Sequence, residues 1–353
     1  MNKRRILISG LIITYTLLFS ACNLIIKTPE AIAKQIVATI GKVRITRGQI
    51  DDSYEFAMNK MYYTQYSGAV LDPERDLNTY FQYKDYALDD MIDIETVLIE
   101  GEKQNIVIDE AKLKENVDKK LEEFKVYFIN SENQTFDQEG YEEYFKSLGI
   151  TEETFNLYTE KSEKVELIWE QLLKDVAPPT DEEIKEDYDK NIETYQKDYN
   201  KLDTDHILVS TQDDKRTDEE ALAIAKEIKS KLDGGADFVA LAKEYSDDTS
   251  NKDDGGKIGE QTFGTLDSGY VDGAKVLKLG EISDPVKSSF GYHIIKLNSI
   301  SFDGDSYEKM KSIISEKLYE GKKTAERETL LEKYKEEMPV VKNKYVTNMY
   351  NFK

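Results

Sequence analysis

The spacing of hydrophobic and polar positions changes twice along the chain. After a short pair of strand-like runs on either side of Gly41, residues 35–202 carry apolar positions mainly at helical spacing. Residues 203–298 follow the order strand, helix, helix, loop, strand, and helical spacing returns in residues 299–353. The pattern predicts an α+β protein in which a mixed segment is inserted between two helical segments.

Threonine-based capping boxes mark three of the predicted helix starts. In such a box the first side chain accepts a hydrogen bond from the backbone three residues on, where a Glu or Gln side chain reaches back. Thr151 begins a further helix, and Pro178-Pro179 ends it, because proline interrupts helical hydrogen bonding. The three boxes are Thr46 with Gln49, Thr180 with Glu183, and Thr217 with Glu220.

The C-terminal segment of residues 299–353 has too few apolar side chains for a core of its own. We therefore expect this tail to pack on the N-terminal helical segment of residues 35–202, which leaves residues 203–298 as an insert. The apolar positions of the tail are Met310, Ile313, Ile314, Leu318, Leu330, Leu331 and Tyr334.

The first residues have the pattern of an export signal. Lys3, Arg4 and Arg5 precede a long apolar run that ends in the small residues Ser20-Ala21. This arrangement predicts a signal peptide over residues 1–21, followed by a tether over residues 22–34.

Cys22, the single cysteine, directly follows this run, and the junction resembles the lipobox of bacterial lipoproteins, with Phe19 where leucine is usual. The resemblance implies that the Cys22 sulfur receives a diacylglyceryl group, which anchors the protein in the cell membrane. The alternative is an uncleaved anchor, since residues 6–26 are apolar over a length that just spans a bilayer. Both readings place the rest of the chain on the extracytoplasmic face, because the basic end stays in the cytoplasm.

Charge and composition exclude several kinds of partner. The net charge of −22 argues against nucleic acid, because a surface that follows phosphates must be basic. A single cysteine cannot form an internal disulfide, so the fold depends on its core. Two histidines and one cysteine leave no transition-metal cluster, and the sequence predicts no cofactor.

The two histidines open two separate strand-like runs, "HILVS" at residues 206–210 and "HIIKL" at residues 293–297. Alternate side chains of a strand share a face, so Ile295 and Leu297 lie on the face of His293. If the two strands are antiparallel neighbours, His206 and His293 meet in the centre of the sheet. Strand histidines taken alone are more often core residues than catalytic ones, and their surroundings reverse that estimate.

Residues 205–298 resemble the parvulin-type peptidyl-prolyl isomerases over their whole length. The matching stretches are "HILVS", "GGADFVALAKEYSDD", "GGKIG" and "LKLGEISDPVKSSFGYHIIKL", in this order. The resemblance implies a four-stranded, mainly antiparallel sheet with surrounding helices. With its lipobox, helical flanks and the stretch "PPTDEEIKEDY", the whole chain resembles PrsA-type foldase lipoproteins.

The resemblance assigns roles to six residues of this chain. The paired active-site histidines correspond to His206 and His293, with Asp248 and Ser288 in the same hydrogen-bond network. An apolar wall for the proline ring corresponds to Leu266 and Tyr270. The chain departs from the family pattern at Lys257, Gln261 and Lys275.

Such a site suits rotation about X-Pro bonds, whose barrier is about 18–20 kcal/mol and which takes tens to hundreds of seconds unaided. No bond needs to break, because catalysis requires only that the twisted amide be bound better than the planar one. The expected partners are unfolded or partly folded exported polypeptides that contain X-Pro bonds. The sequence leaves the oligomeric state open, a dimer included.

A second hypothesis is a non-catalytic holdase whose parvulin-like segment serves as a peptide clamp. Rigid aromatic and flexible Met side chains suit the binding of varied unfolded chains. A solute-binding lipoprotein is disfavoured, because the expected run of βα units is absent from the sequence. The alternative for these residues, and the more common one, is ordinary core packing of a helical domain. The aromatic and Met residues are Tyr54, Phe56, Met58, Met61, Tyr62, Tyr63, Tyr66, Tyr80, Phe81, Tyr83 and Tyr86.

Overall fold

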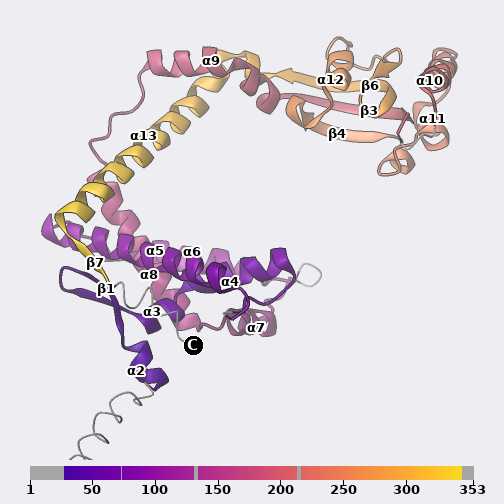
Figure 1. The fold of residues 1–353 in the computed structure, drawn as a ribbon. Coiled ribbons are helices and arrows are strands. Elements are labelled where there is room, and N and C mark those ends of the chain that lie inside the picture. Colours follow the sequence, from indigo (N-terminus) through magenta and orange to yellow (C-terminus); the bar gives the residue numbers. More distant parts are fainter. Residues whose placement is uncertain (1–27, 73, 131–133, 213–215, 344–353) are drawn as a thin grey trace, which may run out of the picture. The chain divides into compact units, whose positions relative to one another are not determined.

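A computed structural model describes residues 28–72, 74–130, 134–212 and 216–343 (Figure 1). The predicted signal peptide and the predicted lipidation site Cys22 lie outside the described residues. Contacts within the chain divide it into two units. The helical unit holds the residues up to Val176 and those from Thr324 onward, and the sheet unit is Ala177–Lys323.

The helical unit is built from seven helices and three short strands among the residues described. Its last strand follows the end of α13, a helix that begins in the sheet unit. The elements are α2 (Pro29–Ala33), β1 (Ile36–Ile40), β2 (Val43–Thr46), α3 (Arg47–Asp51), α4 (Tyr54–Ser67), α5 (Leu77–Lys103), α6 (Glu110–Val126), α7 (Gln138–Leu148), α8 (Glu152–Leu172) and β7 (Val340–Lys342).

The three strands of the helical unit form one antiparallel sheet in the order β2-β1-β7. The turn between β1 and β2 contains Gly41, which confirms the predicted strand pair. Thr46 then caps α3, and its capping box with Gln49 is confirmed as well. Strand β7 pairs with β1 through Thr39 and Val341, about three hundred residues apart in the chain.

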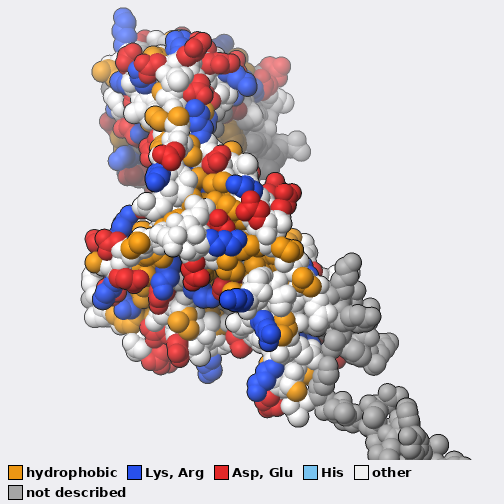
Figure 2. Space-filling view, turned by 90° about the vertical axis from the view of Figure 1, so that its left-hand side faces the viewer, with side chains coloured by type: hydrophobic (Ala, Val, Ile, Leu, Met, Phe, Trp, Pro, Cys, Tyr) orange, Lys and Arg blue, Asp and Glu red, His pale blue; other side chains and the backbone are white. Residues whose placement is uncertain are grey.

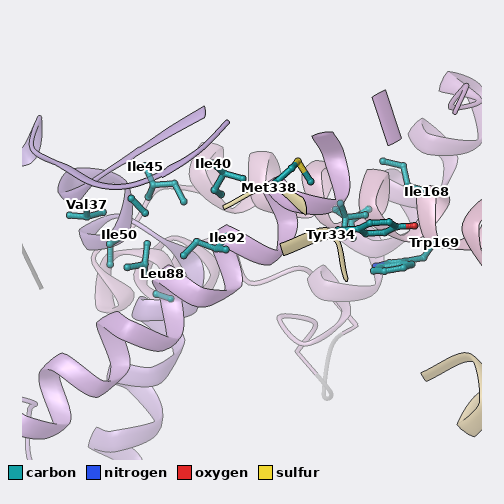
Figure 3. Packing of buried hydrophobic residues seen from close by; sticks show 14 of the residues in the cluster. Val37, Ile40, Ile45, Ile50, Leu88, Ile92, Ile168, Trp169, Tyr334 and Met338 are labelled. Atoms are coloured by element: carbon teal, nitrogen blue, oxygen red, sulfur yellow. The ribbon is translucent and has the colours of Figure 1, made fainter. Parts of the chain in front are cut away.

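The main core of the helical unit lies between this sheet and helices α5, α8 and α13 (Figure 3). Trp169, the single tryptophan, is 5% exposed and packs there with Ile168. Tyr334 and Met338 from the end of α13 belong to the same cluster. The C-terminal part of the chain therefore completes the hydrophobic core that the N-terminal strands and helices begin.

A second core of the helical unit is mainly aromatic and joins α4, α6, α7 and α8. Phe124 lies at its centre, with ring centroids 4.6 Å from Phe155 and 5.4 Å from Tyr144. Of the aromatic residues proposed for client binding, Phe56 is buried, so most of its surface is unavailable to a partner. Others keep much of their surface exposed: Tyr62, Tyr66 and Tyr86.

The sheet unit combines four strands with five helices, one of them shared, and three single 3₁₀ turns. The elements are α9 (Asp181–Tyr199), β3 (Asn200–Ser210), α10 (Asp218–Asp233), α11 (Phe238–Tyr245), η1 (Lys252–Asp254), β4 (Lys257–Thr262), η2 (Phe263–Thr265), α12 (Ser268–Ala274), β5 (Val286–Lys287), β6 (Gly291–Phe302), η3 (Asp303–Asp305) and α13 (Tyr307–Glu337).

The sheet of this unit is antiparallel throughout, in the order β4-β3-β6-β5. One face carries Ile207, Val209 and Ile294, which pack on α10 and α11. The other face carries Ile295 and further residues that pack on α12. The α+β class, the four-stranded sheet and the helix starts at Thr180 and Thr217 are confirmed.

Helix α9 and the first part of α13 share a small core of their own within the sheet unit. Tyr188 and Tyr195 of α9 pack with Met310 and Ile314 of α13. The Tyr188 hydroxyl donates to the Gly304 carbonyl at 3.1 Å, which ties α9 to the turn before α13. The independence of residues 203–298 from the helical segments stays a prediction.

The surface of the described residues is charged and mixed in sign. Blue and red side chains are interspersed on the face seen in Figure 2, as expected for a solvated acidic protein. No helix within the described ranges is both long and apolar enough to cross a membrane.

Candidate active site

The two histidines lie on adjacent antiparallel strands, as predicted. In the β3–β6 register His206 is opposite Ile295, and Leu208 is opposite His293, so the histidines are diagonal neighbours on one face. Their rings are stacked, with centroids 5.2 Å apart, planes 21° apart, and the two Nδ1 atoms at 3.0 Å. Each residue is only 4% exposed.

Asp248 reaches His206 from the loop that follows α11. This loop is fixed to β3, because the Asp247 amide donates to the Leu208 carbonyl at 2.8 Å. The Leu208 amide in turn donates to Ser246 Oγ at 3.2 Å. Asp248 Oδ2 thereby lies 2.9 Å from His206 Nε2.

Ser288 contacts the other end of the histidine pair from the turn between β5 and β6. Its Oγ lies 2.6 Å from His293 Nε2 and accepts a hydrogen bond from the Phe290 amide at 3.0 Å. The Ser288 amide donates to the Gly291 carbonyl at 2.9 Å, which closes the turn. The four predicted polar residues therefore form one continuous hydrogen-bonded chain.

The contacts favour one direction of donation along this chain. If Ser288 donates to His293 Nε2, then His293 Nδ1–H donates to His206 Nδ1, and His206 Nε2–H donates to Asp248. The opposite direction would place an unprotonated His206 Nε2 against the Asp248 carboxylate. Two acceptors at 2.9 Å repel each other, so these four residues taken alone favour the first direction when both imidazoles are neutral.

Burial keeps both imidazoles neutral near pH 7. It lowers the pKa of His293 to about 3, with a further lowering from neighbouring His206. Burial also lowers the pKa of His206, although its hydrogen bond to Asp248 opposes this shift. For Asp248, burial raises the pKa, but hydrogen bonds from Ser250 and His206 outweigh it, so the net shift is downward.

Tyr270 on α12 covers the histidine pair. Its ring is perpendicular to that of His293, with centroids 5.0 Å apart, and its hydroxyl donates to Thr204 Oγ1 at 2.9 Å. Burial raises the pKa of this hydroxyl, so it stays protonated. Leu266 packs, half-buried, on the apolar cluster that contains Tyr270. The roles of both residues as the wall of a proline pocket stay predictions.

Gly256, in the stretch "GGKIG", lets β4 approach His206 closely. Its carbonyl accepts the His206 amide at 2.7 Å, and its φ of +80° favours glycine. A Cβ atom at this position would lie 2.0 Å from the His206 carbonyl oxygen. The double glycine therefore fixes the backbone of His206 rather than its side chain.

Three residues that contact the site were not predicted from the sequence. The Asn251 side chain reaches both His206 and Asp248, and Thr204 holds the Tyr270 hydroxyl. Arg216 forms an ion pair with Asp247, next to Asp248 in the chain. The alternation of β3 places Thr204 on the face of His206, a signal that could have identified it. Asn251 and Arg216 lie in loops or next to them, where no periodicity indicates a side-chain direction.

The site holds no arrangement for a metal ion. Within residues 28–343, gaps excluded, no group of three or more His, Cys, Asp or Glu side chains is placed to bind one.

Comparison with known proteins matches both units. Residues 206–299 match the family of PPIC-type PPIASE domains, which spans the four polar residues of the site. Residues 2–173 match the SurA-like N-terminal domain family. The two matches together cover most of the chain, and residues 174–205 and the tail after residue 299 lie outside both.

Curated relatives match nearly the whole chain. A foldase protein PrsA from Clostridium kluyveri is 33% identical over 347 residues, covering 92% of this chain and 96% of the relative. A foldase protein PrsA from Clostridium tetani is 31% identical, covering 95% of each chain. A crystal structure of a peptidylprolyl isomerase (PrsA) from Bacillus anthracis is 28% identical, covers 71% of this chain and 96% of that one, and has a TM-score of 0.30.

Proposed function

This chain belongs to the PrsA foldase family, and on that premise we propose that it is an extracytoplasmic peptidyl-prolyl cis-trans isomerase that assists the folding of exported proteins. The observation that carries the proposal is the buried chain Ser288–His293–His206–Asp248, which lies under Tyr270. Its substrates are unfolded or partly folded exported polypeptides with X-Pro bonds.

The proposed mechanism needs no covalent intermediate. When the X-Pro bond twists, the amide loses resonance, and the charge on its oxygen and nitrogen changes. Leu266 and Tyr270 hold the pyrrolidine ring, while the fixed dipoles of the histidine chain stabilise the twisted amide more than the planar one. Because both imidazoles are neutral near pH 7, their hydrogen bonds supply a field without placing a full charge beside the substrate.

The role of Asp248 is to hold the histidine pair. Its pKa is lowered, so it remains an anion that accepts from His206 Nε2–H. Its second oxygen, Oδ1, accepts the Ser250 hydroxyl at 2.6 Å and the Ser250 amide at 3.0 Å. A carboxylate engaged on both oxygens is a poor nucleophile, which supports a positioning role.

The test is isomerisation of a series of X-Pro peptides by the mature protein. We expect a rate above background, and a strong reduction in the double variant His206→Ala, His293→Ala. The same variant should keep its suppression of aggregation of an unfolded, proline-poor client. Circular dichroism controls for folding, because removing buried polar groups also destabilises a domain. A folded double variant with the wild-type rate would show that these histidines are not the site.

The alternative of a non-catalytic holdase is not favoured. Peptide binding alone does not require a buried network of polar side chains, which is costly unless every hydrogen-bond partner is present. The complete network of this site therefore supports catalysis over a mere peptide clamp. An inactive wild-type protein that still suppresses aggregation would instead support the holdase.

We also propose that Cys22 is lipidated and holds the protein at the outer face of the cell membrane. Support comes from the basic, apolar and small-residue pattern that ends at the single cysteine. Labelled fatty acid should enter the wild-type protein in a bacterial host but not the Cys22→Ser variant. Equal labelling of both, or persistence of the uncleaved N-terminus in the wild type, would support the transmembrane anchor instead.

A further inference from the structure

The side chain of Asn251 contacts both members of the His206–Asp248 pair. Its Nδ2 lies 2.9 Å from Asp248 Oδ2 and 3.2 Å from His206 Nε2. An amide NH₂ group has two hydrogens, so it can donate to two acceptors at once. Asn251 therefore contacts the edge of the His206 ring that faces Asp248.

Local structure does not explain this side chain. Asn251 precedes η1, but its side chain makes no capping hydrogen bond to that turn. The turn is held instead by its main-chain carbonyl, which accepts the amides of Asp254 at 2.9 Å and Gly256 at 3.0 Å. Any residue could supply that carbonyl, so the turn alone does not require asparagine.

The orientation of the Asn251 side-chain amide leaves one of its polar atoms without a hydrogen bond. With Nδ2 toward the site, Asn251 Oδ1 is buried and has no hydrogen-bond partner among the described residues. An unsatisfied buried acceptor is unfavourable. The flipped amide would place an oxygen 2.9 Å from the Asp248 carboxylate, which is worse because both groups are acceptors. The unsatisfied oxygen is thus the consequence of aiming two donors at the site.

These donors change which tautomers the two histidines of the hydrogen-bonded chain can adopt. Without Asn251, an unprotonated His206 Nε2 faces only a carboxylate, and the donation direction from Ser288 to Asp248 is the only favourable one. With Asn251, one N–H donates to Asp248 and the other to an unprotonated His206 Nε2, and these two hydrogen bonds offset the repulsion between the two acceptors. Donation can then run the other way, from His206 Nδ1–H to His293 Nδ1 and from His293 Nε2–H to Ser288.

We propose that Asn251 is a positioning residue of the histidine pair, whose amide lets the Nε2 edge of His206 act as donor or as acceptor beside an ionised Asp248. When the direction of hydrogen-bond donation reverses, the dipole of the four hydrogen-bonded residues is inverted without movement of a net charge. The electric field on the substrate can then change with the charge on the twisting amide. This role rests on the proposed isomerase function.

The test combines ¹⁵N spectroscopy of the imidazoles with peptide kinetics, both on the mature protein. The chain has only two histidines, so ring nitrogens are readily assigned, and protonated and unprotonated nitrogens resonate far apart. Asn251→Leu removes both donors and keeps the branched shape of the side chain, and Asn251→Ala is a second variant in case the larger leucine prevents folding. The matched control is Asn298→Ala, since the Asn298 amide also contacts two side chains, here the carboxylates of Asp203 and Asp205 on the exposed surface.

In the wild type we expect His206 Nε2 to resonate between the protonated and unprotonated positions. In both Asn251 variants it should move to the protonated position, with kcat/KM reduced about tenfold, as for the loss of one hydrogen bond to a charged group. Asn298→Ala should change neither. Unchanged Nε2 resonances in folded Asn251 variants would overturn the inference, whatever the activity. An inactive wild type whose Nε2 resonance still responds would support the role of Asn251 and refute the isomerase function.

Discussion

Acid should destabilise the sheet unit through its two buried histidines. The pKa of His293 is about 3 in the folded protein, against about 6.5 for an exposed histidine. Below pH 6.5 the His293 imidazole is therefore protonated in the unfolded chain but not in the folded protein. The stability of the folded state is fully present above pH 6.5 and falls as the pH drops from there toward 3.

The expected loss follows from linkage. Well below pH 6.5, each pH unit removes about 1.4 kcal/mol through His293, so this histidine costs about 2 kcal/mol between pH 6.5 and 4.5. The lowered pKa of His206 acts in the same direction. Asp248, with its lowered pKa, adds its loss only below about pH 4, where an unfolded carboxylate begins to protonate.

The helical unit should respond with the opposite sign, which supplies an internal control. Burial, with the charges of Glu55 and Asp93, raises the pKa of Asp90 to about 6. The folded helical unit therefore binds a proton more readily than the unfolded chain, and this group adds stability as the pH falls from 6 toward 4. Acid should thus lower the stability of the sheet unit, while protonation of Asp90 adds to the stability of the helical unit.

The assay is urea unfolding at pH 7 and pH 4.5, observed with one probe in each unit. Fluorescence of Trp169 reports on the helical unit, and the imidazole proton resonances report on the sheet unit. The double variant His206→Gln, His293→Gln should lose most of the pH dependence of the sheet unit. A sheet unit with equal stability at the two pH values, or imidazoles that titrate near pH 6.5 while folded, would refute the reasoning.

Three further outcomes are expected. Gly256→Ala should destabilise the sheet unit by about 2–4 kcal/mol, because its Cβ would lie 2.0 Å from the His206 carbonyl oxygen, as measured by urea unfolding. Gly235→Ala, with φ +90° and open space, should cost only about 1–2 kcal/mol and is the matched control. Trp169→Ala should cost about 3–5 kcal/mol and shift only the transition of the helical unit, followed by circular dichroism because the variant lacks the fluorescent probe; a shift of the imidazole transition would contradict it. Replacing residues 203–298 by a short flexible linker should abolish isomerisation, while the helical unit stays folded and still suppresses aggregation. If the helical unit stays folded but no longer suppresses aggregation, the deleted segment is the part that binds clients.

Local signals in the sequence predicted much of this structure. The capping boxes at Thr46, Thr180 and Thr217 act within four residues, so their hydrogen bonds are encoded side by side in the chain. Strand alternation similarly placed His206 and His293 on one face, and a matching register brought them together.

Features that depend on distant or irregular parts were not predicted. The pairing of β7 with β1 joins residues about three hundred positions apart, and a strand of only three residues carries no signal of its partner. The sharing of α13 between the two units, with its first part packed on α9 and its end in the helical unit, was not predicted either. Asn251 was missed because a side chain in a loop has no period from which its direction follows.

The β1–β7 pairing has a consequence for the order in which the protein is built. A ribosome releases β1 early and β7 only after about three hundred further residues, so β1 must wait with one edge unpaired. The sheet unit ends at Lys323, so all of its residues are available before β7 is synthesised. Vectorial synthesis therefore completes the sheet unit first, and the nascent helical unit spends the longest time unfinished, exposed to proteases and to pairing with foreign strands.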